Sequence, residues 1–215
     1  MTKSEVLQTI EVGKIVPVIR TNSESEAERL VAAILAGGIK IFEITLSVPN
    51  APSVIERLAE KFGDRVLLGA GTVLNVEQAE QCFKAGAKFI VSPILNLDVV
   101  KFCRDCGIAV FPAGLTPNEI YAAANAKADA VKVFPVNSMG GAGYLKSLKA
   151  VFPHVKLMPT GGVNLETIAD FFLSGAFAVG IGSDLADTKL LGAGNNAQIT
   201  KLAENFIKKL LKNNN

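Results

Sequence analysis

The stretch "IVPVIRTNSESEAERLVAAILAGGIKIFEIT", residues 15–45, contains the unit of secondary structure that repeats along the whole chain. It begins with a short β-branched run (15–20) and ends with a second one (40–45). Between them, residues 23–38 have the spacing of an amphipathic helix, with polar residues before it and glycines after it. The stretch therefore predicts a strand, a helix and a second strand, the unit that connects parallel strands in a sheet.

The same rhythm continues to the end of the chain. Amphipathic segments such as 51–63 and 75–87 alternate with further candidate strands at 66–71, 89–93, 108–113, 130–135, 155–160 and 176–182. Eight strands, each followed by a helix, predict an α/β protein: a single-domain (β/α)8 TIM barrel over residues 1–215, with an N-terminal helix. An open doubly wound sheet is the alternative, but no G-x-G-x-x-G follows the first strand. A surface loop (186–198) is expected before a last helix (199–212).

Charge and hydropathy exclude several kinds of partner. The 22 basic and 20 acidic residues leave a net charge of +2 without a basic run, so nucleic acid is not an expected partner. The apolar stretches are shorter than the roughly 20 residues that span a membrane, and the N-terminus lacks the apolar segment of a signal peptide. We therefore expect a soluble cytoplasmic protein. The final "KKLLKNNN" (208–215) has the pattern of a fraying helix tail.

The three cysteines do not indicate a metal site. Cys103 and Cys106 form a C-x-x-C, but zinc would need two more ligands. Only Cys82 and His154 are available, and their spacing does not match. Because the segment around the C-x-x-C has helical periodicity, we interpret these cysteines as structural and His154 as a surface residue.

One lysine, Lys132, lies in the middle of the apolar run "AVKVFPV" (130–136). Burying an ammonium group costs several kcal/mol unless it is paired or gives up its proton. Side-chain alternation places the neighbouring valines on the helix side, so Lys132 points into the barrel. The same argument points Glu43 inward from the second strand and places Phe42 and Ile44 on the helix side. Both strands are even-numbered and lie across the barrel from each other, so the two side chains can share one interior layer around a small substrate.

Two interpretations of this pair are open. The simpler one is a structural ion pair, or two polar ends that reach solvent. The other is carbonyl chemistry, because a desolvated lysine is easier to deprotonate and its neutral amine can attack a ketone to give a Schiff base. The protonated imine then stabilises the enamine formed when a neighbouring C–C bond breaks, while Glu43 shuttles protons. This chemistry requires no metal, and no strand end carries a His/Asp/Glu cluster that would hold one.

Other strand ends predict where the rest of a substrate binds. "PTGGVN" (159–164) and "GIGSDL" (180–185) end strands seven and eight, the recurring phosphate site of this fold, and Ser183 adds a hydroxyl donor. Tight βα turns are the alternative explanation for these glycines. After "GAG" of the third strand, Thr72 could meet a carboxylate or a hydroxyl. Arg20 is the only arginine at a strand end and suits a bidentate contact with a carboxylate, although an ordinary exposed rim arginine fits equally well.

With these features, the sequence resembles the class I aldolases that act on 2-keto-3-deoxy-6-phosphogluconate (KDPG) and 4-hydroxy-2-oxoglutarate (KHG). The motifs "FEITLSVPNA", "GAGTVLN", "KFIVSP", "AVKVFPV", "PTGGVN" and "VGIGSDL" occur in the family's order over residues 15–185. A single "PTGG" would be weak evidence. The ordered set, with glutamate in one motif and lysine in another, is highly specific.

The resemblance implies that Lys132 is the Schiff-base lysine and Glu43 the proton-shuttling acid/base. It implies substrate-binding residues at Thr72, Pro93, Phe134, Thr160, Gly161, Gly162, Gly182 and Ser183, with pyruvate at the first three and phosphate at the glycines and Ser183. The implied reaction is a cofactor-free cleavage of KDPG to pyruvate and glyceraldehyde 3-phosphate. Many members also cleave KHG to pyruvate and glyoxylate. A homotrimer is implied as well.

One position departs from the family pattern. Many members carry an arginine just after the E-x-T-L of the second strand, where it contacts the substrate carboxylate, but this chain has Ser47. We therefore assign the carboxylate to Arg20 as a hypothesis. Because a galactonate-specific branch also lacks the arginine, the preferred C4 epimer stays open. The rival functions are a phosphate-binding barrel isomerase or synthase, which would not need a lysine within strand six, and a non-catalytic phosphate-ligand sensor.

Overall fold

A computed structural model describes residues 1–212 of the chain. Within them, the parallel strands are β1 (Ile15–Ile19), β2 (Ile41–Thr45), β3 (Leu67–Gly71), β4 (Phe89–Val91), β5 (Ala109–Phe111), β6 (Val131–Val133), β7 (Leu157–Pro159) and β8 (Val179–Ile181). Hydrogen-bonded ladders join six of them in the order β5-β4-β3-β2-β1-β8 and join β6 to β7. Isolated bridges between Ala113 and Lys132 and between Thr160 and Gly180 connect the two groups. The predicted TIM barrel is therefore confirmed, and the open-sheet alternative is wrong.

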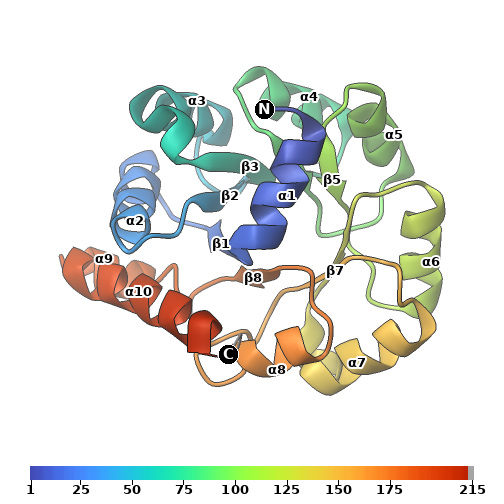
Figure 1. Cartoon of the computed structure of the whole chain (residues 1–215). Coiled ribbons are helices and arrows are strands. Elements are labelled where there is room, and N and C mark those ends of the chain that lie inside the picture. Colours follow the sequence, from blue (N-terminus) through green and yellow to red (C-terminus); the bar gives the residue numbers. More distant parts are fainter. Residues whose placement is uncertain (213–215) are drawn as a thin grey trace.

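Helices surround this ring of strands (Figure 1). They are α1 (Lys3–Gly13), α2 (Glu24–Ala36), α3 (Ala51–Phe62), α4 (Val76–Lys84), α5 (Leu97–Asp105), α6 (Pro117–Asn125), α7 (Ala142–Val151), α8 (Ile168–Leu173), α9 (Thr188–Gly192) and α10 (Asn196–Lys212), with 3-10 turns η1 (Gly63–Arg65) and η2 (Val136–Met139). Polar caps start several of them, as when Ser23 accepts a hydrogen bond from the backbone of Glu26. None of the helices described is long and apolar enough to cross a membrane.

The segment expected to be a surface loop before the last helix contains helical structure, so that prediction is wrong in part. Asp187 caps the short helix α9 by accepting hydrogen bonds from the backbone of Lys189 and Leu190. Leu191 is buried and anchors this helix. The last helix, α10, begins three residues earlier than expected, and residues 213–215 of the predicted tail lie outside the described residues.

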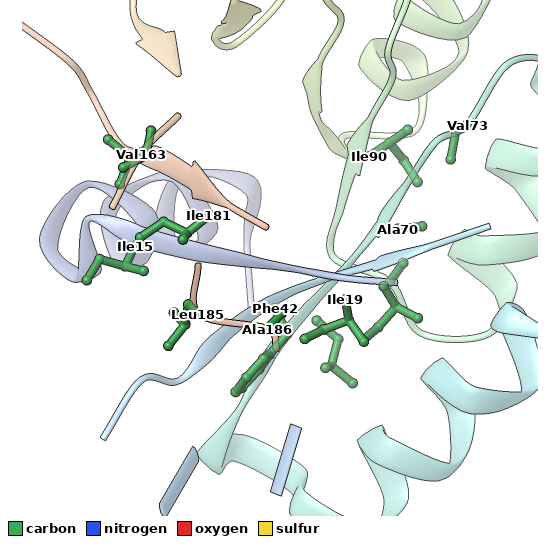
Figure 2. Close-up of a cluster of buried hydrophobic side chains, with 14 of the residues drawn as sticks. Ile15, Ile19, Phe42, Ala70, Val73, Ile90, Val163, Ile181, Leu185 and Ala186 are labelled. Carbon is green, nitrogen blue, oxygen red and sulfur yellow. The ribbon is translucent and has the colours of Figure 1, made fainter. Parts of the chain in front are cut away.

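Two apolar layers hold the barrel together. One fills its interior and includes Ile41, Phe89 and Phe111. The other lies between strands and helices, where Figure 2 shows Ile19 and Phe42 among the buried side chains. Ile41 thus faces inward while Phe42 faces the helices, as side-chain alternation predicts.

The N-terminal helix α1 closes the barrel at the end where the strands begin, and Figure 1 shows it lying across the ring. Its Val6 and Ile10 are buried in the interior apolar cluster. Two ion pairs attach it to the barrel: Lys3 Nζ lies 2.8 Å from Asp129 Oδ1, and Lys156 Nζ lies 2.9 Å from Glu11 Oε2. The opposite end, where the strands end, stays open for a site.

Candidate active site

Lys132 of β6 and Glu43 of β2 meet inside the barrel, as alternation predicts. Lys132 Nζ lies 3.2 Å from Glu43 Oε1 and 3.5 Å from Oε2. The glutamate is 0% exposed and the lysine 5% exposed. Exchanging a buried ion pair for apolar residues is often neutral or stabilising, so such a pair is weak evidence for a role in stability. Its presence at the open end of the barrel therefore points to chemistry.

Gly71, at the end of β3, makes room for the Glu43 carboxylate. The register places Glu43 beside Gly69 and Thr45 beside Gly71. A Cβ atom on Gly71 would overlap Glu43 Oε1 and contact its Cγ. The glycines of "GAG" thus do more than form a turn, because they allow the carboxylate to approach the backbone of β3.

A cavity of about 520 Å³ opens above the pair. Ten residues predicted to form the site line it: Arg20, Thr72, Pro93, Lys132, Phe134, Thr160, Gly161, Gly162, Gly182 and Ser183. Glu43 lies behind Lys132, to which it is hydrogen-bonded. Eight different strands and their following loops form one barrel end, which is why residues so far apart in sequence come together.

Three further lining residues were not predicted: Val18, Val163 and Asp184. Alternation could have found Val18, because it shares a face with Val16 of the interior cluster and with Arg20. Asp184 directly follows the predicted Ser183 and could have been found by extending that loop by one residue. Val163 directly follows the predicted Gly161 and Gly162, so extending the loop after β7 by one residue would have found it as well.

Thr160 carries a buried hydroxyl that needs a partner. Among residues 1–212, its Oγ1 is the buried side-chain polar atom that finds no hydrogen bond, and the residue is 6% exposed. A Cβ atom on Gly180 would overlap this oxygen, so the glycine of β8 preserves its space. An unpaired buried hydroxyl costs about 1–3 kcal/mol, which a ligand in the cavity would recover.

Thr72 has a backbone conformation that is rare for a β-branched residue. Its φ is 60°, in the left-handed region. The next residue, Val73, is tied down by a hydrogen bond of 3.2 Å from its N–H to the carbonyl of Val91. Backbone strain of this kind concentrates at functional sites, and here it fixes Thr72 at the wall of the cavity.

The loops after β6 and β7 pack closely at the other side of the cavity. Gly161 and Gly162 have φ values of 97° and 71°, which only glycine adopts easily. A Cβ on Gly162 would lie 2.7 Å from the Cβ of Asn137 in η2. Phe134 stands beside the lysine, with Lys132 Nζ 5.6 Å from its ring centroid.

Ser47, where many members of the similar family carry an arginine, is part of a hydrogen-bond relay. The hydroxyls of Thr45 and Ser47 are 2.7 Å apart, and Thr45 donates to the carbonyl of Ile19 at 2.8 Å. Thr45 is fully buried. These hydrogen bonds hold Ile19, the last residue of β1. Arg20 is the next residue in the sequence and lines the cavity.

Other polar groups do not form a comparable site. A larger hollow of about 840 Å³ lies at the closed end of the barrel, lined in part by Glu5, Lys40 and Asp64, but it contains no buried lysine–carboxylate pair. In the described part of the chain, no three His, Cys, Asp or Glu side chains are grouped to hold a metal ion. Cys103 of α5 is buried, and Cys106, directly after this helix, is exposed.

Comparisons with known proteins agree with this geometry. A family model described as KDPG and KHG aldolase matches residues 6–202. A 2-dehydro-3-deoxy-phosphogluconate aldolase of Treponema pallidum is 33% identical over 199 residues, which is 93% of this chain and 94% of that protein. A 2-dehydro-3-deoxy-6-phosphogalactonate aldolase of Escherichia coli is 34% identical over 172 residues, 80% of this chain and 83% of that protein.

A solved structure is similar over almost the whole chain. The KDPG aldolase from Legionella pneumophila, with pyruvate captured at low pH as a covalent carbinolamine intermediate, has a TM-score of 0.85 and 30% identity. The match covers 95% of this chain and 97% of that one. The family model spans the barrel strands and the cavity residues alike, and the named relatives are aldolases, which are lyases. The chain therefore belongs to the KDPG and KHG aldolase family.

Proposed function

We propose that this protein is a Schiff-base (class I) aldolase that cleaves KDPG to pyruvate and glyceraldehyde 3-phosphate. The observation that carries the proposal is the buried contact of 3.2 Å between Lys132 and Glu43 at the floor of an open cavity. The ordered lining of that cavity supports it. So do the relatives, which are named as aldolases of phosphorylated 2-dehydro-3-deoxy sugar acids.

The pair can carry out each proton transfer of the reaction. Starting from the ion pair, Glu43 takes one proton from the Lys132 ammonium, and the neutral amine attacks the keto carbon. Glu43 then passes two of the three nitrogen protons, one after the other, to the former carbonyl oxygen, which leaves as water, while the third proton stays on the iminium nitrogen. Glu43 then takes the proton of the C4 hydroxyl while the C3–C4 bonding pair moves toward the iminium, which releases the aldehyde. The enamine takes a proton at C3, and water hydrolyses the imine to free pyruvate and Lys132.

The lining residues divide between the two ends of the substrate. Near Lys132, we assign the pyruvate carboxylate to Arg20 and Thr72, with Pro93 and Phe134 as the apolar wall. At the other end, we assign the phosphate to uncharged hydrogen-bond donors, which are hydroxyl and backbone N–H groups. They belong to Thr160, Gly161, Gly162, Gly182 and Ser183. The unpaired Thr160 hydroxyl supports this assignment, because a substrate oxygen would supply its missing partner.

A second candidate substrate is the C4 epimer, 2-keto-3-deoxy-6-phosphogalactonate. Two observations favour it: Ser47 replaces the family arginine, and a relative at 34% identity is named for that substrate. Comparing kcat/KM for the two epimers separates the candidates, because a preference above about tenfold corresponds to 1.4 kcal/mol of transition-state binding. Cleavage of KHG to pyruvate and glyoxylate is a third activity to measure in the same assay.

Borohydride trapping with pyruvate tests the function. Reduction should fix pyruvate on Lys132, identified by peptide mass spectrometry, and should abolish activity. The control is Lys132→Arg, which keeps the charge but cannot form an imine. No adduct, with pyruvate binding shown separately, would contradict the aldolase proposal and favour the isomerase or synthase alternative. An adduct without cleavage of any substrate would favour the non-catalytic sensor.

We also propose that three copies assemble into a trimer, as the resemblance implies. Leu74 and Ile94, on the loops that follow β3 and β4, and Leu97, the first residue of α5, are 42%, 47% and 54% exposed. These loops lie together, since Asn96 Nδ2 donates to the carbonyl of Leu74 at 3.0 Å. Grouped exposed apolar residues are typical of contact surfaces. The cytoplasmic location expected from the sequence stays a prediction.

A further inference from the structure

An acidic side chain, Asp184, lies at the end of the cavity assigned to phosphate. It lines the cavity together with Gly161, Gly162 and Ser183. Its position is fixed by the turn that follows β8, where the backbone N–H groups of Leu185 and Ala186 both donate to the carbonyl of Gly182.

The same turn is anchored in the core. Leu185 is 0% exposed and Ala186 5% exposed, and Figure 2 shows both among the apolar side chains between strands and helices. The backbone at Asp184 therefore cannot move away from the cavity without unpacking its two neighbours. Within residues 1–212, its carboxylate has no ion pair or hydrogen bond to the protein.

The charges along the cavity do not favour a phosphate dianion. Arg20 and Lys132 are the cationic residues among those that line it, and Asp184 is the anionic one. Lys132 is paired with Glu43, and Arg20 is assigned to the pyruvate carboxylate. The phosphate end therefore offers neutral donors and one negative charge, with no cation of its own.

We propose that Asp184 lowers the selectivity of this site for phosphorylated substrates, so that the enzyme also cleaves the unphosphorylated 3-deoxy-2-keto acid. This inference rests on the proposed aldolase function. The repulsion between Asp184 and a phosphate is moderated by water, because the side chain is exposed at the mouth. A terminal hydroxyl suffers no such repulsion and can donate a hydrogen bond to the carboxylate.

The added reaction uses the same chemistry and needs no further reactant. With 2-keto-3-deoxygluconate, the C3–C4 bond breaks and its electron pair enters the enamine on Lys132. The C4 hydroxyl proton passes to Glu43, and the leaving aldehyde is glyceraldehyde. Protonation at C3 and hydrolysis then release pyruvate.

Charge-removing variants provide the test. We compare kcat/KM for the phosphorylated and unphosphorylated substrates in the natural chain and in Asp184→Asn, by following pyruvate release. The ratio of phosphorylated to unphosphorylated kcat/KM should rise about threefold to tenfold in the variant, and the rise should shrink as ionic strength increases from about 0.01 M to 0.5 M. Asp64→Asn is the matched control, because it removes the same charge from an exposed position at the closed end of the barrel.

A binding measurement separates this inference from the proposed function. Calorimetric titration with 3-phosphoglycerate, a stable analogue of the aldehyde product, should show a dissociation constant about threefold to tenfold lower in Asp184→Asn than in the natural chain. An unchanged ratio and an unchanged dissociation constant would overturn the role of Asp184, even if borohydride trapping succeeds. Natural enzyme that releases no pyruvate from the unphosphorylated acid would overturn the added activity. A failed trapping experiment with stronger 3-phosphoglycerate binding in the variant would instead reject the aldolase function and the added cleavage, while it would keep the repulsion between Asp184 and a phosphate.

Discussion

At the scale of single residues, the Lys132–Glu43 pair separates the demands of stability from those of activity. Removing one member of a buried pair leaves an uncompensated charge and typically costs 3–5 kcal/mol, whereas replacing both with apolar residues is often neutral. We therefore expect Lys132→Met to lower the free energy of unfolding by about 3 kcal/mol and Lys132→Met/Glu43→Leu to recover most of it, while both lack activity. Urea denaturation and the cleavage assay measure the two quantities. A double variant no more stable than the single one would show that the pair is a structural requirement.

Arg20 and Ser47 allow a test of which strand end supplies the arginine that binds the substrate carboxylate. If Arg20 holds the carboxylate, Arg20→Ala should weaken pyruvate binding about 10- to 100-fold, the range expected for a lost charged hydrogen bond. Adding Ser47→Arg to that variant should restore part of the affinity, because the Thr45 hydroxyl links Ser47 to the end of β1, from which Arg20 enters the cavity. The rate of borohydride inactivation at varied pyruvate concentration measures the affinity.

The control for this pair is Arg65→Ala, which removes an exposed arginine from the closed end of the barrel. Unchanged pyruvate affinity in Arg20→Ala would remove the assignment. If the double variant binds pyruvate no better than Arg20→Ala, an arginine after β2 cannot replace the arginine after β1 in binding the carboxylate.

The cysteines should differ strongly in reactivity. Burial raises the pKa of the Cys82 thiol to about 11 and, together with the nearby Cys106, that of Cys103 to about 12. Only the thiolate is nucleophilic, so both groups stay unreactive at pH 8, whereas Cys106 is exposed. One fast thiol in the native protein and three after denaturation are expected with a disulfide reagent such as dithionitrobenzoate. Rapid labelling of Cys103 in the native state would contradict the structural interpretation of the C-x-x-C.

At the scale of elements, the strands were predictable because a barrel strand is buried on both faces. Each produces a short β-branched run, and all eight predicted runs contain an observed strand. The observed β6, Val131–Val133, is shorter than the predicted 130–135, because the chain leaves the ladder where the site loop begins. Helix α9 was not predictable in the same way, since its five residues are too few for a helical period, its last residue is Gly192 and Gly194 follows it closely.

The N-terminal helix offers a test at the same scale. Ile10→Ala removes a fully buried side chain from helix α1, which closes one end of the barrel. It should lower the free energy of unfolding by about 2–4 kcal/mol. Catalysis should be almost unaffected, because the pair and its cavity lie at the other end. Val12→Ala, on the same helix but 76% exposed, is the matched control and should change stability by less than about 0.5 kcal/mol. A large fall in kcat for Ile10→Ala with stability retained would show that helix α1 also shapes the cavity around Lys132.

At the scale of the whole molecule, barrel topology explains which site residues sequence reasoning could find. Strand ends meet at one rim, so Glu43 and Lys132 could be placed together although 89 positions separate them. What topology leaves open is whether a polar group finds a partner after folding. The empty hydrogen-bond position of Thr160 and the isolated charge of Asp184 depend on the packing around them, and a sequence does not display that packing.

The assembly of several chains is expected to depend on the exposed apolar residues of the loops after β3 and β4 and of the start of α5. If the patch of Leu74, Ile94 and Leu97 joins copies of the chain, a charge there must be desolvated in the interface, which costs several kcal/mol. Leu97→Asp suits the test because an acidic residue in the first turn of α5 favours the helix dipole and leaves the monomer folded. Light scattering should show three chains per particle for the natural protein and single chains for Leu97→Asp. The control is Val12→Asp, at the closed end of the barrel, which should also form particles of three chains. A Leu97→Asp trimer would move the contact surface elsewhere, and a monomeric natural protein would contradict the trimer itself.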